Sequence, residues 1–495
     1  MKLLTIGIDG GDRSILESMP MPYLHELIAK FTPKLLNENL LDRGWAEILS
    51  GREACDTNAY YQMALCDKTY RISRSYSLRD LRVNEDVTPI WDLLGRRGYK
   101  VGMLNVPTTN PAPEVNGFLV SGGGGGVFST EGIPAQMVYP QETKSILESL
   151  GYIFDIRLLS SGAGTFSELV DNIELAEEGQ KNAFLQLCSQ HQPDFGFFCF
   201  RITTELQYLA MSEIENYKNL KNNQPDGSFF PPPGNAVQQS LLQHYKHMDL
   251  CIKELIETLK PEHIIFTADH GTAPYRVEFN TDVLLRELGF LNNMSPVARL
   301  KRALVKQGKS ILPGSLKAKL KPKSKGPSVR VPATAFERRT TRAFGTVFDT
   351  GNFAGIYIND GERFGGPVSG ERAIAKEIEN VIDGFNQSEQ AKLHGLNAVP
   401  YQSLYAGRRY HKSLPDIRII KPDHYFFTCR KSEFAINNEN YGPVPMDIRG
   451  LRYPHTGVKG SHPLFVLDKV AASLIRDDDP DDLRTVYRVI DRLFP

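Results

Sequence analysis

The most constraining feature of this chain is a series of short apolar runs, each followed by a segment with helical periodicity. The runs cover residues 3–8, 99–106, 195–200 and 263–268. Short runs without an alternating polar face are typical of strands buried on both sides, as in a parallel sheet. A later segment places apolar residues three or four positions apart, at Leu241, Tyr245, Met248, Ile252, Leu255 and Leu259. This spacing indicates an amphipathic helix. The alternation predicts an α/β fold with a mostly parallel, doubly wound sheet flanked by helices.

Length and charge narrow the class of protein. At 495 residues the chain exceeds a comfortable single domain, which predicts a large core with a subdomain or a second domain. The 58 basic and 58 acidic residues balance, so no global field attracts nucleic acid. No stretch approaches the ~20 apolar residues of a membrane span. The apolar run before Asp9 is too short for a secretion signal, and the scattered cysteines suit reduced, buried thiols. We expect a cytoplasmic protein.

Composition also suggests how the chain is divided. We predict a main α/β core over residues 1–295, a basic, Pro- and Lys-rich insert or linker over residues 296–335, and cap elements that return to the core over residues 336–495. The segment from Arg299 to Arg342 is rich in basic residues. It is interpreted either as a solvated linker or as a docking surface for an anionic substrate, membrane or polymer.

Polar residues follow two of the apolar runs directly. Asp9 ends the first run, and Asp269 with His270 ends the run over residues 263–268. In an open α/β sheet, ligands collect where the carboxyl ends of neighbouring strands meet. Two carboxylates and an imidazole converging there form a three-ligand set for one divalent metal ion, with positions open for water or substrate. A metal-free, hydrogen-bonded cluster is the alternative.

The sequence around these residues resembles the type I phosphodiesterase/nucleotide pyrophosphatase branch of the alkaline phosphatase superfamily, nearly from end to end. The matching stretches include "LLTIGIDGGDRSIL", "TPIWDLLGRRGYKVGMLNVPTTNPAPEVNGFLVSG" and "HYKHMDLCIKELIETLKPEHIIFTADHG". The resemblance implies an alkaline-phosphatase-like core and two metals, usually zinc, that hold both oxygens of an in-line displacement. One of these metals takes the positions of Asp9, Asp269 and His270, together with a Ser or Thr nucleophile.

The resemblance implies different residues for the second metal. In the family this ion takes an Asp and a His four apart on the strand after "PD", and a late His. Thr204 and Tyr208 fall on the first two positions here, and Lys459 most simply takes the third. His455 and His462 are close enough in sequence to substitute. A hydroxyl and a phenol are poor replacements for a carboxylate and an imidazole, so one retained metal is expected, preferentially zinc.

The nucleophile also departs from the family pattern. In "LLDRGWAEILSG", Trp45, Ser50 and Gly51 match the family, but the hydroxyl position falls near Leu41. Asp42 is the nearby group that could replace the nucleophile as a ligand or attack a substrate. Its alternative role is that of a turn or helix-start residue.

Three hypotheses for function follow. The first is a one-metal hydrolase or transferase of a phosphate or sulfate ester, with a small-molecule, lipid-linked or saccharide-linked substrate. The metal would lower the pKa of a bound water, and Lys459 or a nearby arginine would neutralise the transferring group. The second is a pseudoenzyme that binds a phosphorylated or sulfated ligand, or a partner protein, without turnover. The third is a scaffold that uses the basic segment.

His244 and His247 are expected on a solvated helix face.

Overall fold

The computed structural model describes residues 1–40, 42–61, 63–73, 86–123, 132–158, 161–223, 230–294, 328–330, 336–348, 351–405, 412–428 and 432–495. The chain divides into two compact units. Unit 1 comprises Met1–Tyr60, Tyr76–Arg276 and Asn438–Pro495, and unit 2 comprises Tyr61–Ser75 and Val277–Asn437. The division suggested by the sequence, with boundaries at residues 295 and 335, stays a prediction.

The core of unit 1 is a mostly parallel sheet. Within the described residues its strands follow the order β2 (Thr32–Pro33), β20 (Phe465–Leu467), β9 (His263–Thr267), β1 (Leu3–Ile8), β8 (Phe195–Phe200), β5 (Val101–Val106), β6 (Gly117–Ser121) and β7 (Val138–Tyr139). The five strands from β9 to β6 are parallel to one another. β20, β2 and β7 are antiparallel to their neighbours. The predicted α/β architecture with strands buried on both faces is confirmed.

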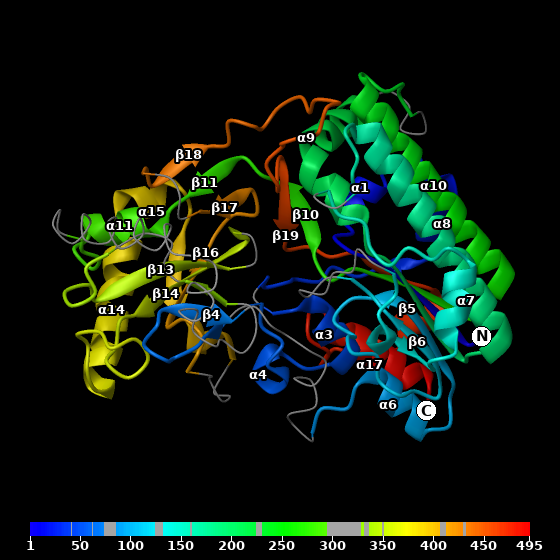
Figure 1. The fold of residues 1–495 in the computed structure, drawn as a ribbon, viewed down its shortest axis with the longest axis horizontal. Helices are drawn as coiled ribbons and strands as arrows, with labels where there is room; N and C mark the ends of the chain where they lie inside the picture. The colour runs from blue at the N-terminus through cyan, green and yellow to red at the C-terminus, as the bar shows by residue number, and fades with distance from the viewer. Residues whose placement is uncertain are drawn as a thin grey trace, which may run out of the picture. The chain divides into compact units, whose positions relative to one another are not determined.

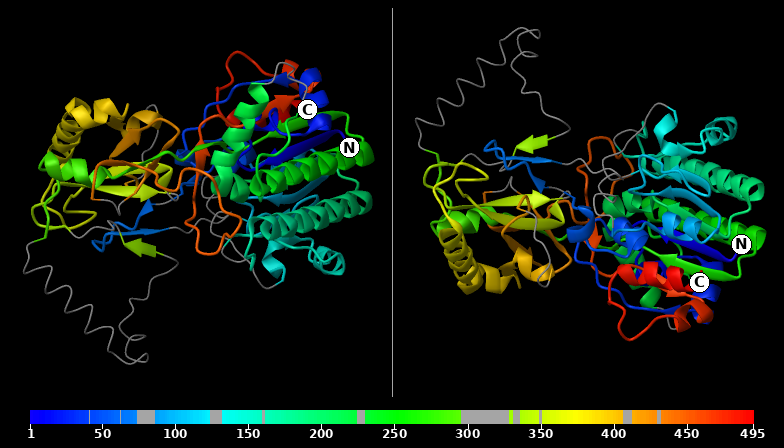
Figure 2. Two further views of the ribbon diagram at one scale, coloured as in Figure 1. Left: turned by 90° about the horizontal axis from the view of Figure 1, so that it is seen from above. Right: turned by 90° about the horizontal axis from the view of Figure 1, so that it is seen from below.

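Helices cover both faces of this sheet (Figures 1 and 2). One face carries α2 (Pro22–Lys30), α8 (Phe166–His191) and α10 (Ala236–Leu259), and the other carries α3 (Gly44–Ser50), α6 (Ile90–Arg96) and α17 (Arg484–Leu493). The strands alternate accordingly, because Ile6 and Phe198 join the core under α8 and α10, whereas Phe197 packs against Trp45 of α3. A doubly wound sheet therefore separates two apolar layers.

Shorter elements complete unit 1. They are α1 (Arg13–Leu16), α4 (Ala54–Thr57), a 3₁₀ turn (Ala135–Met137), α7 (Thr143–Ser149) and α16 (Lys469–Ser473). The ribbon of β10 (Gly271–Pro274) and β19 (Gly457–Gly460) is antiparallel and pairs Thr272 with Lys459. This pairing brings a late segment of the chain to the end of β9.

α9 (Thr203–Asn222) begins shortly after β8 ends. Thr204 and Tyr208 therefore lie in the first turns of this helix. The expectation that they lie on the strand was wrong, because the apolar run that forms the strand stops at Phe200 and polar residues follow it. On a helix, positions four apart face the same side, so both residues face the same neighbours.

Unit 2 is built around an antiparallel sheet with the order β13 (Ala343–Phe348), β14 (Phe353–Ile358), β16 (Ile417–Ile420) and β15 (Asn397–Pro400). Its helices are α11 (Thr281–Glu287), α14 (Glu371–Gln387), α15 (Glu389–Leu393) and a 3₁₀ turn (Tyr401–Tyr405). Two small sheets join β11 (Val277–Phe279) with β17 (Tyr425–Phe427) and β18 (Ala435–Asn437), and β4 (Arg71–Ser73) with β3 (Met63–Ala64) and β12 (Ser328–Arg330).

The basic segment from Arg299 to Arg342 lies outside the described residues except for residues 328–330 and 336–342, so its role as linker or docking surface stays a prediction. Among the helices of the described ranges, none combines the length and the apolar character that crossing a membrane requires.

Candidate metal centre

Three side chains meet at the carboxyl ends of β1 and β9. His270 Nε2 lies 3.8 Å from Asp9 Oδ1 and 3.7 Å from Asp269 Oδ2. All three residues are buried, and one potential ligand atom from each lies within 4.8 Å of the other two. The structure thus brings together the three residues that the sequence predicted as metal ligands. The cause is the pairing of β1 with β9, which are adjacent parallel strands.

Hydrogen bonds orient each of these side chains. Trp45 Nε1 donates to Asp9 Oδ2 at 3.1 Å, and the backbone N–H of Gly10 donates to Asp269 Oδ1 at 3.4 Å. His270 Nδ1 lies 2.6 Å from the carbonyl oxygen of Gly271. Because a carbonyl only accepts, Nδ1 carries a proton, and Nε2 is the ring nitrogen that faces the two carboxylates. This is the arrangement in which an imidazole can bind a metal.

The electrostatics of the cluster fit a divalent cation. Burial raises the pKa of Asp269 well above its usual range, and the nearby Asp9 carboxylate raises it further. Lys459 and the Gly10 N–H oppose that rise in pKa. Two buried carboxylates at short range repel each other, and a metal ion between them would relieve the repulsion. One nitrogen and two oxygen donors suit zinc, and the residues present therefore fit the metal that the family resemblance implies.

Among the three residues considered for the late-histidine position, Lys459 has a charge that acts on the cluster. It is buried on β19 opposite Thr272, and its charge lowers the pKa of Asp269. His455 is also buried, and its backbone N–H donates to the carbonyl of Tyr208 at 3.0 Å. The side chain of His462 is exposed. Within the described residues, neither histidine belongs to the cluster formed by Asp9, Asp269 and His270.

The start of α9 packs over the cluster. A Cβ added to Gly10 would lie 2.3 Å from Thr204 Cγ2, so the threonine methyl sits directly on the turn after β1. The ring of Tyr208 stacks on His270 with centroids 6.5 Å apart and an interplanar angle of 23°. Sequence reasoning missed Gln207, which accepts a hydrogen bond from Thr272 Oγ1 at 2.7 Å. The only sequence signal for Gln207 is that it lies within one helical turn of Thr204 and Tyr208.

Asp42 is buried and serves as a backbone acceptor. Its Oδ2 accepts the N–H of Ala54, the first residue of α4, at 3.1 Å. Its charge also raises the pKa of the buried carboxyls of Glu38 and Glu47, for which burial is the larger cause. This geometry corresponds to the helix-start role that was the alternative for Asp42, and its proposed catalytic role stays a prediction. Leu41 lies outside the described residues.

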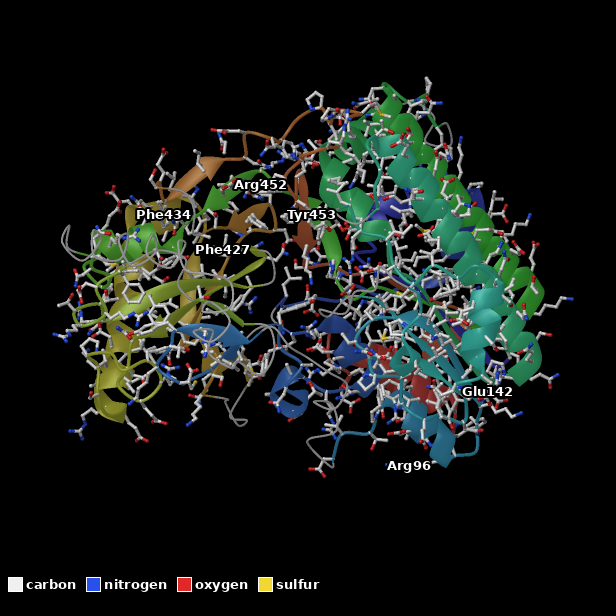
Figure 3. All side chains as sticks on the ribbon, viewed as in Figure 1. Arg96, Glu142, Phe427, Phe434, Arg452 and Tyr453 are labelled. Atoms are coloured by element: carbon white, nitrogen blue, oxygen red, sulfur yellow. The ribbon has the colours of Figure 1, made fainter. Side chains whose placement is uncertain are left out.

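A charged network that sequence reasoning did not foresee anchors the start of α9. Arg157 pairs with Asp155 and with Glu205, each at 2.8 Å. Arg201 also pairs with Asp155. Tyr453 lies on the chain that leads into β19 (Figure 3), and its ring lies 5.9 Å from that of Tyr208. Opposite charges from separate segments thus hold α9 in place above the metal-ligand cluster.

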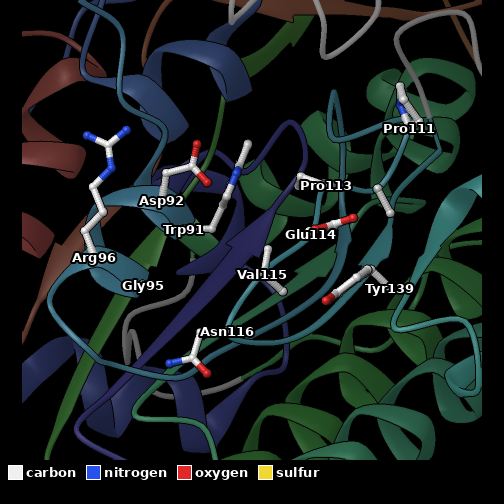
Figure 4. A pocket seen from close by; sticks show the side chains of 11 residues that line it. Trp91, Asp92, Gly95, Arg96, Pro111, Pro113, Glu114, Val115, Asn116 and Tyr139 are labelled. Atoms are coloured by element: carbon white, nitrogen blue, oxygen red, sulfur yellow. The ribbon is translucent and has the colours of Figure 1, made fainter.

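Unit 1 also has an open hollow of about 830 Å³ that other residues line. It lies along α6 and the segment after β5, and its lining includes Trp91, Arg96, Glu114, Asn116 and Tyr139 (Figure 4). None of the three candidate metal ligands lines it. Within the described residues, the chemistry-bearing cluster and this hollow are therefore separate features.

One solved structure is similar enough to this chain to support the fold. Phosphonoacetate hydrolase from Sinorhizobium meliloti 1021, in complex with phosphonoformate, superimposes with a TM-score of 0.56 at 11% identity, over 100% of this chain and 96% of that chain. Murine ectonucleotide pyrophosphatase/phosphodiesterase 5 superimposes with a TM-score of 0.45 at 12% identity, over 100% and 95%. No curated protein sequence matches this chain.

The sequence itself establishes the family. The fold is a mixed α/β architecture with a large, mostly parallel central sheet between two layers of helices. The family model for type I phosphodiesterase / nucleotide pyrophosphatase matches residues 57–442. The chain belongs to the type I phosphodiesterase/nucleotide pyrophosphatase family. The matched range contains Asp269 and His270, whereas Asp9 and Lys459 lie outside it.

Proposed function

We propose that this protein hydrolyses or transfers a phosphate ester, or a sulfate ester, with one divalent metal ion, preferentially zinc. The ligands are Asp9, Asp269 and His270. The observation that carries the proposal is their convergence as three buried side chains with ligand atoms within 4.8 Å of one another. Such a set leaves coordination positions for water and substrate.

The protein's own residues have separate roles in this proposal. A divalent ion held by the three ligands would act as a Lewis acid and lower the pKa of water. Trp45 and the Gly10 N–H hold the two carboxylates in orientation. The ammonium of Lys459 supplies positive charge beside Asp269 and neutralises part of the charge on the transferring group.

We propose water, rather than Asp42, as the nucleophile. The Asp42 carboxylate is buried and already accepts the N–H of Ala54. Substitution Asp42→Asn keeps the oxygen that accepts this hydrogen bond and removes the nucleophilic carboxylate. We expect the variant to retain turnover at a level that follows its stability. A folded Asp42→Asn protein with no turnover would instead establish Asp42 as the nucleophile.

The alternative function is a pseudoenzyme that binds a phosphorylated or sulfated ligand, or a partner protein, without turnover. The observation that favours it is the packing of Thr204 and Tyr208 at the positions assigned to the second metal. The Thr204 methyl abuts Gly10, and the Tyr208 ring covers His270. Neither side chain supplies a carboxylate or an imidazole, so charge stabilisation on that side of the substrate would be weaker.

The test combines metal content and turnover. Elemental mass spectrometry would be applied to wild type, Asp269→Asn and the control Asp249→Asn, whose carboxylate accepts N–H groups at the start of α2. We expect wild type and Asp249→Asn to hold one metal per chain more than Asp269→Asn. Equal metal content in wild type and Asp269→Asn would refute the site.

Turnover then separates the two functions. Aryl phosphate monoesters, diesters and aryl sulfates are suitable probes, with and without metal depletion. Metal-dependent turnover that Asp269→Asn abolishes supports the enzyme. A bound metal without turnover, combined with thermal stabilisation by phosphate or sulfate, supports the binding protein.

Substrate class and cellular location extend the proposal. The natural ester is proposed to be a small molecule or a lipid-linked or saccharide-linked compound, with no nucleic acid partner. A cytoplasmic location is proposed because Cys188, Cys199 and Cys251 are buried free thiols. The segment from Arg299 to Arg342 is proposed to contact an anionic partner, if it is more than a linker.

A further inference from the structure

A seam of polar side chains runs between α8 and α10, which pack side by side on one face of the unit 1 sheet (Figure 1). Gln243 of α10 donates to Glu174 of α8 at 2.9 Å. Further along, Lys181 of α8 pairs with Glu254 of α10. Interfaces between long amphipathic helices usually bury apolar residues, so a polar seam at this position needs a physical explanation.

The middle of the seam is buried, which overturns one expectation. His244 is fully buried rather than on a solvated face, and His247 is half-buried. The sequence pattern places both histidines beside the apolar stripe of α10, but α8 covers that side. His244 Nδ1 lies 3.8 Å from Glu177 Oε2, and Glu177 is also fully buried. Within the described residues, neither side chain has a hydrogen-bond partner.

Next to this buried pair lie three side chains with metal-ligating atoms. His247 Nε2 is 3.4 Å from Cys251 Sγ, and Cys251 Sγ is 3.9 Å from Glu178 Oε2. One potential ligand atom from each lies within 4.8 Å of the other two. His247 and Cys251 are four residues apart on α10 and therefore face the same side of the helix. Glu178 approaches them from α8.

Hydrogen bonds already orient the carboxylate of Glu178. Lys181 Nζ donates to Glu178 Oε1 at 2.7 Å, and Asn182 Nδ2 donates to the same oxygen at 3.2 Å. The other oxygen, Oε2, faces Cys251. Because Oε1 is held by these two donors, Oε2 has a fixed position. Metal-binding carboxylates are typically oriented in this way.

We propose that Glu178, His247 and Cys251 bind a thiophilic divalent metal ion of the zinc class, which fastens α8 to α10. The site is distinct from the cluster formed by Asp9, Asp269 and His270 and does not depend on the proposed function. One sulfur, one nitrogen and one oxygen donor suit zinc, with water in the fourth position.

Charge balance supports the assignment. Cys251 binds as the thiolate, so binding releases its proton to solvent. The metal then carries two positive charges against one negative charge each from the thiolate and Glu178. Lys181 does not upset this balance because Glu254 neutralises it. The side chain of Glu178 is 44% exposed and His247 is half-buried, so an ion can reach the buried sulfur from solvent.

Cobalt(II) provides a selective test in the full-length protein, because only a thiolate ligand produces a sulfur-to-cobalt charge-transfer band in the near ultraviolet. Metal-depleted protein is titrated with Co²⁺ and then with Zn²⁺. The matched control is Cys188→Ser, which removes another buried thiol in the same helix pair. Asp269→Asn serves as a second control that disables the other cluster.

We expect the band in wild type, Cys188→Ser and Asp269→Asn, with one Co²⁺ per chain responsible for it and displacement by Zn²⁺. Cys251→Ser should lack the band, and His247→Gln should weaken Co²⁺ affinity at least 10-fold. Because His247 is only half-buried, we expect His247→Gln to fold. Its Co²⁺ affinity therefore tests the site even if Cys251→Ser fails to fold. Absence of the band in wild type, its persistence in Cys251→Ser, its loss in Asp269→Asn or unchanged affinity in His247→Gln would overturn the proposal.

Discussion

The hydrogen bond from Trp45 to Asp9 offers the sharpest test of the metal centre. Trp45 is 2% exposed, and its Nε1 donates to Asp9 Oδ2 at 3.1 Å. Trp45→Phe removes this donor and leaves a buried carboxylate oxygen without it. The chain contains only two tryptophans, and the other one is a matched control. Trp91 is 1% exposed, and within the described residues its Nε1 has no hydrogen-bond acceptor.

The two substitutions remove the same volume and differ in one hydrogen bond. A hydrogen bond to a charged group contributes about 1.5–3 kcal/mol, so Trp45→Phe should lower the free energy of unfolding by about that much more than Trp91→Phe. Residues that orient a metal ligand typically contribute 10–100-fold to metal affinity. We therefore expect Trp45→Phe to bind metal about 10–100-fold more weakly, whereas Trp91→Phe should match wild type.

The assay measures both quantities on the same samples. Urea unfolding followed by circular dichroism gives the free energy of unfolding without metal, and competition with a chromophoric chelator gives metal affinity. Each variant retains one tryptophan, so fluorescence reports on that part of the fold. If Trp45→Phe and Trp91→Phe bind metal with the same affinity, the argument that Trp45 orients a metal ligand is refuted.

Three further predictions address charge, backbone and pH. Lys459→Met should retain metal and lower ester turnover by about 10²-fold, because a charge near the transferring group is lost; steady-state kinetics beside elemental analysis will show whether metal loss is the true cause. Gly10→Ala should lower the free energy of unfolding by at least about 2 kcal/mol, since φ is +70° and the new Cβ would meet Thr204. Gly98→Ala, with φ of +85° and nothing within 4 Å, carries the backbone strain without the clash, and an equal loss in both would contradict this reasoning. Burial raises the pKa of Glu38 from 4.5 to about 8. A carboxyl group whose pKa is raised in the folded state contributes stability below pH 4.5, and this contribution is lost as pH rises through 8. The melting temperature of wild type should therefore fall more steeply from pH 7 to 9 than that of Glu38→Gln.

Local sequence determined much of the core and the make-up of the candidate centre. The apolar runs over residues 3–8 and 195–200 form β1 and β8 with the expected bounds, because burial on both faces leaves a pattern within the strand itself. The same logic predicted that Asp9, Asp269 and His270 would meet. Polar residues that directly follow adjacent parallel strands must gather at one edge of the sheet.

Tertiary structure decided what surrounds these ligands. The carbonyl of Gly271 holds one ring nitrogen of His270, so that the other faces the two carboxylates. β19 brings Lys459 to the centre by pairing with β10. The polar seam between α8 and α10 could not be predicted from the sequence either. The burial of His244 depends on α8 and not on the pattern of α10. Strand ends and helical periods are local properties and can be predicted from spacing. Contacts between distant segments depend on packing geometry, which spacing along the chain does not specify.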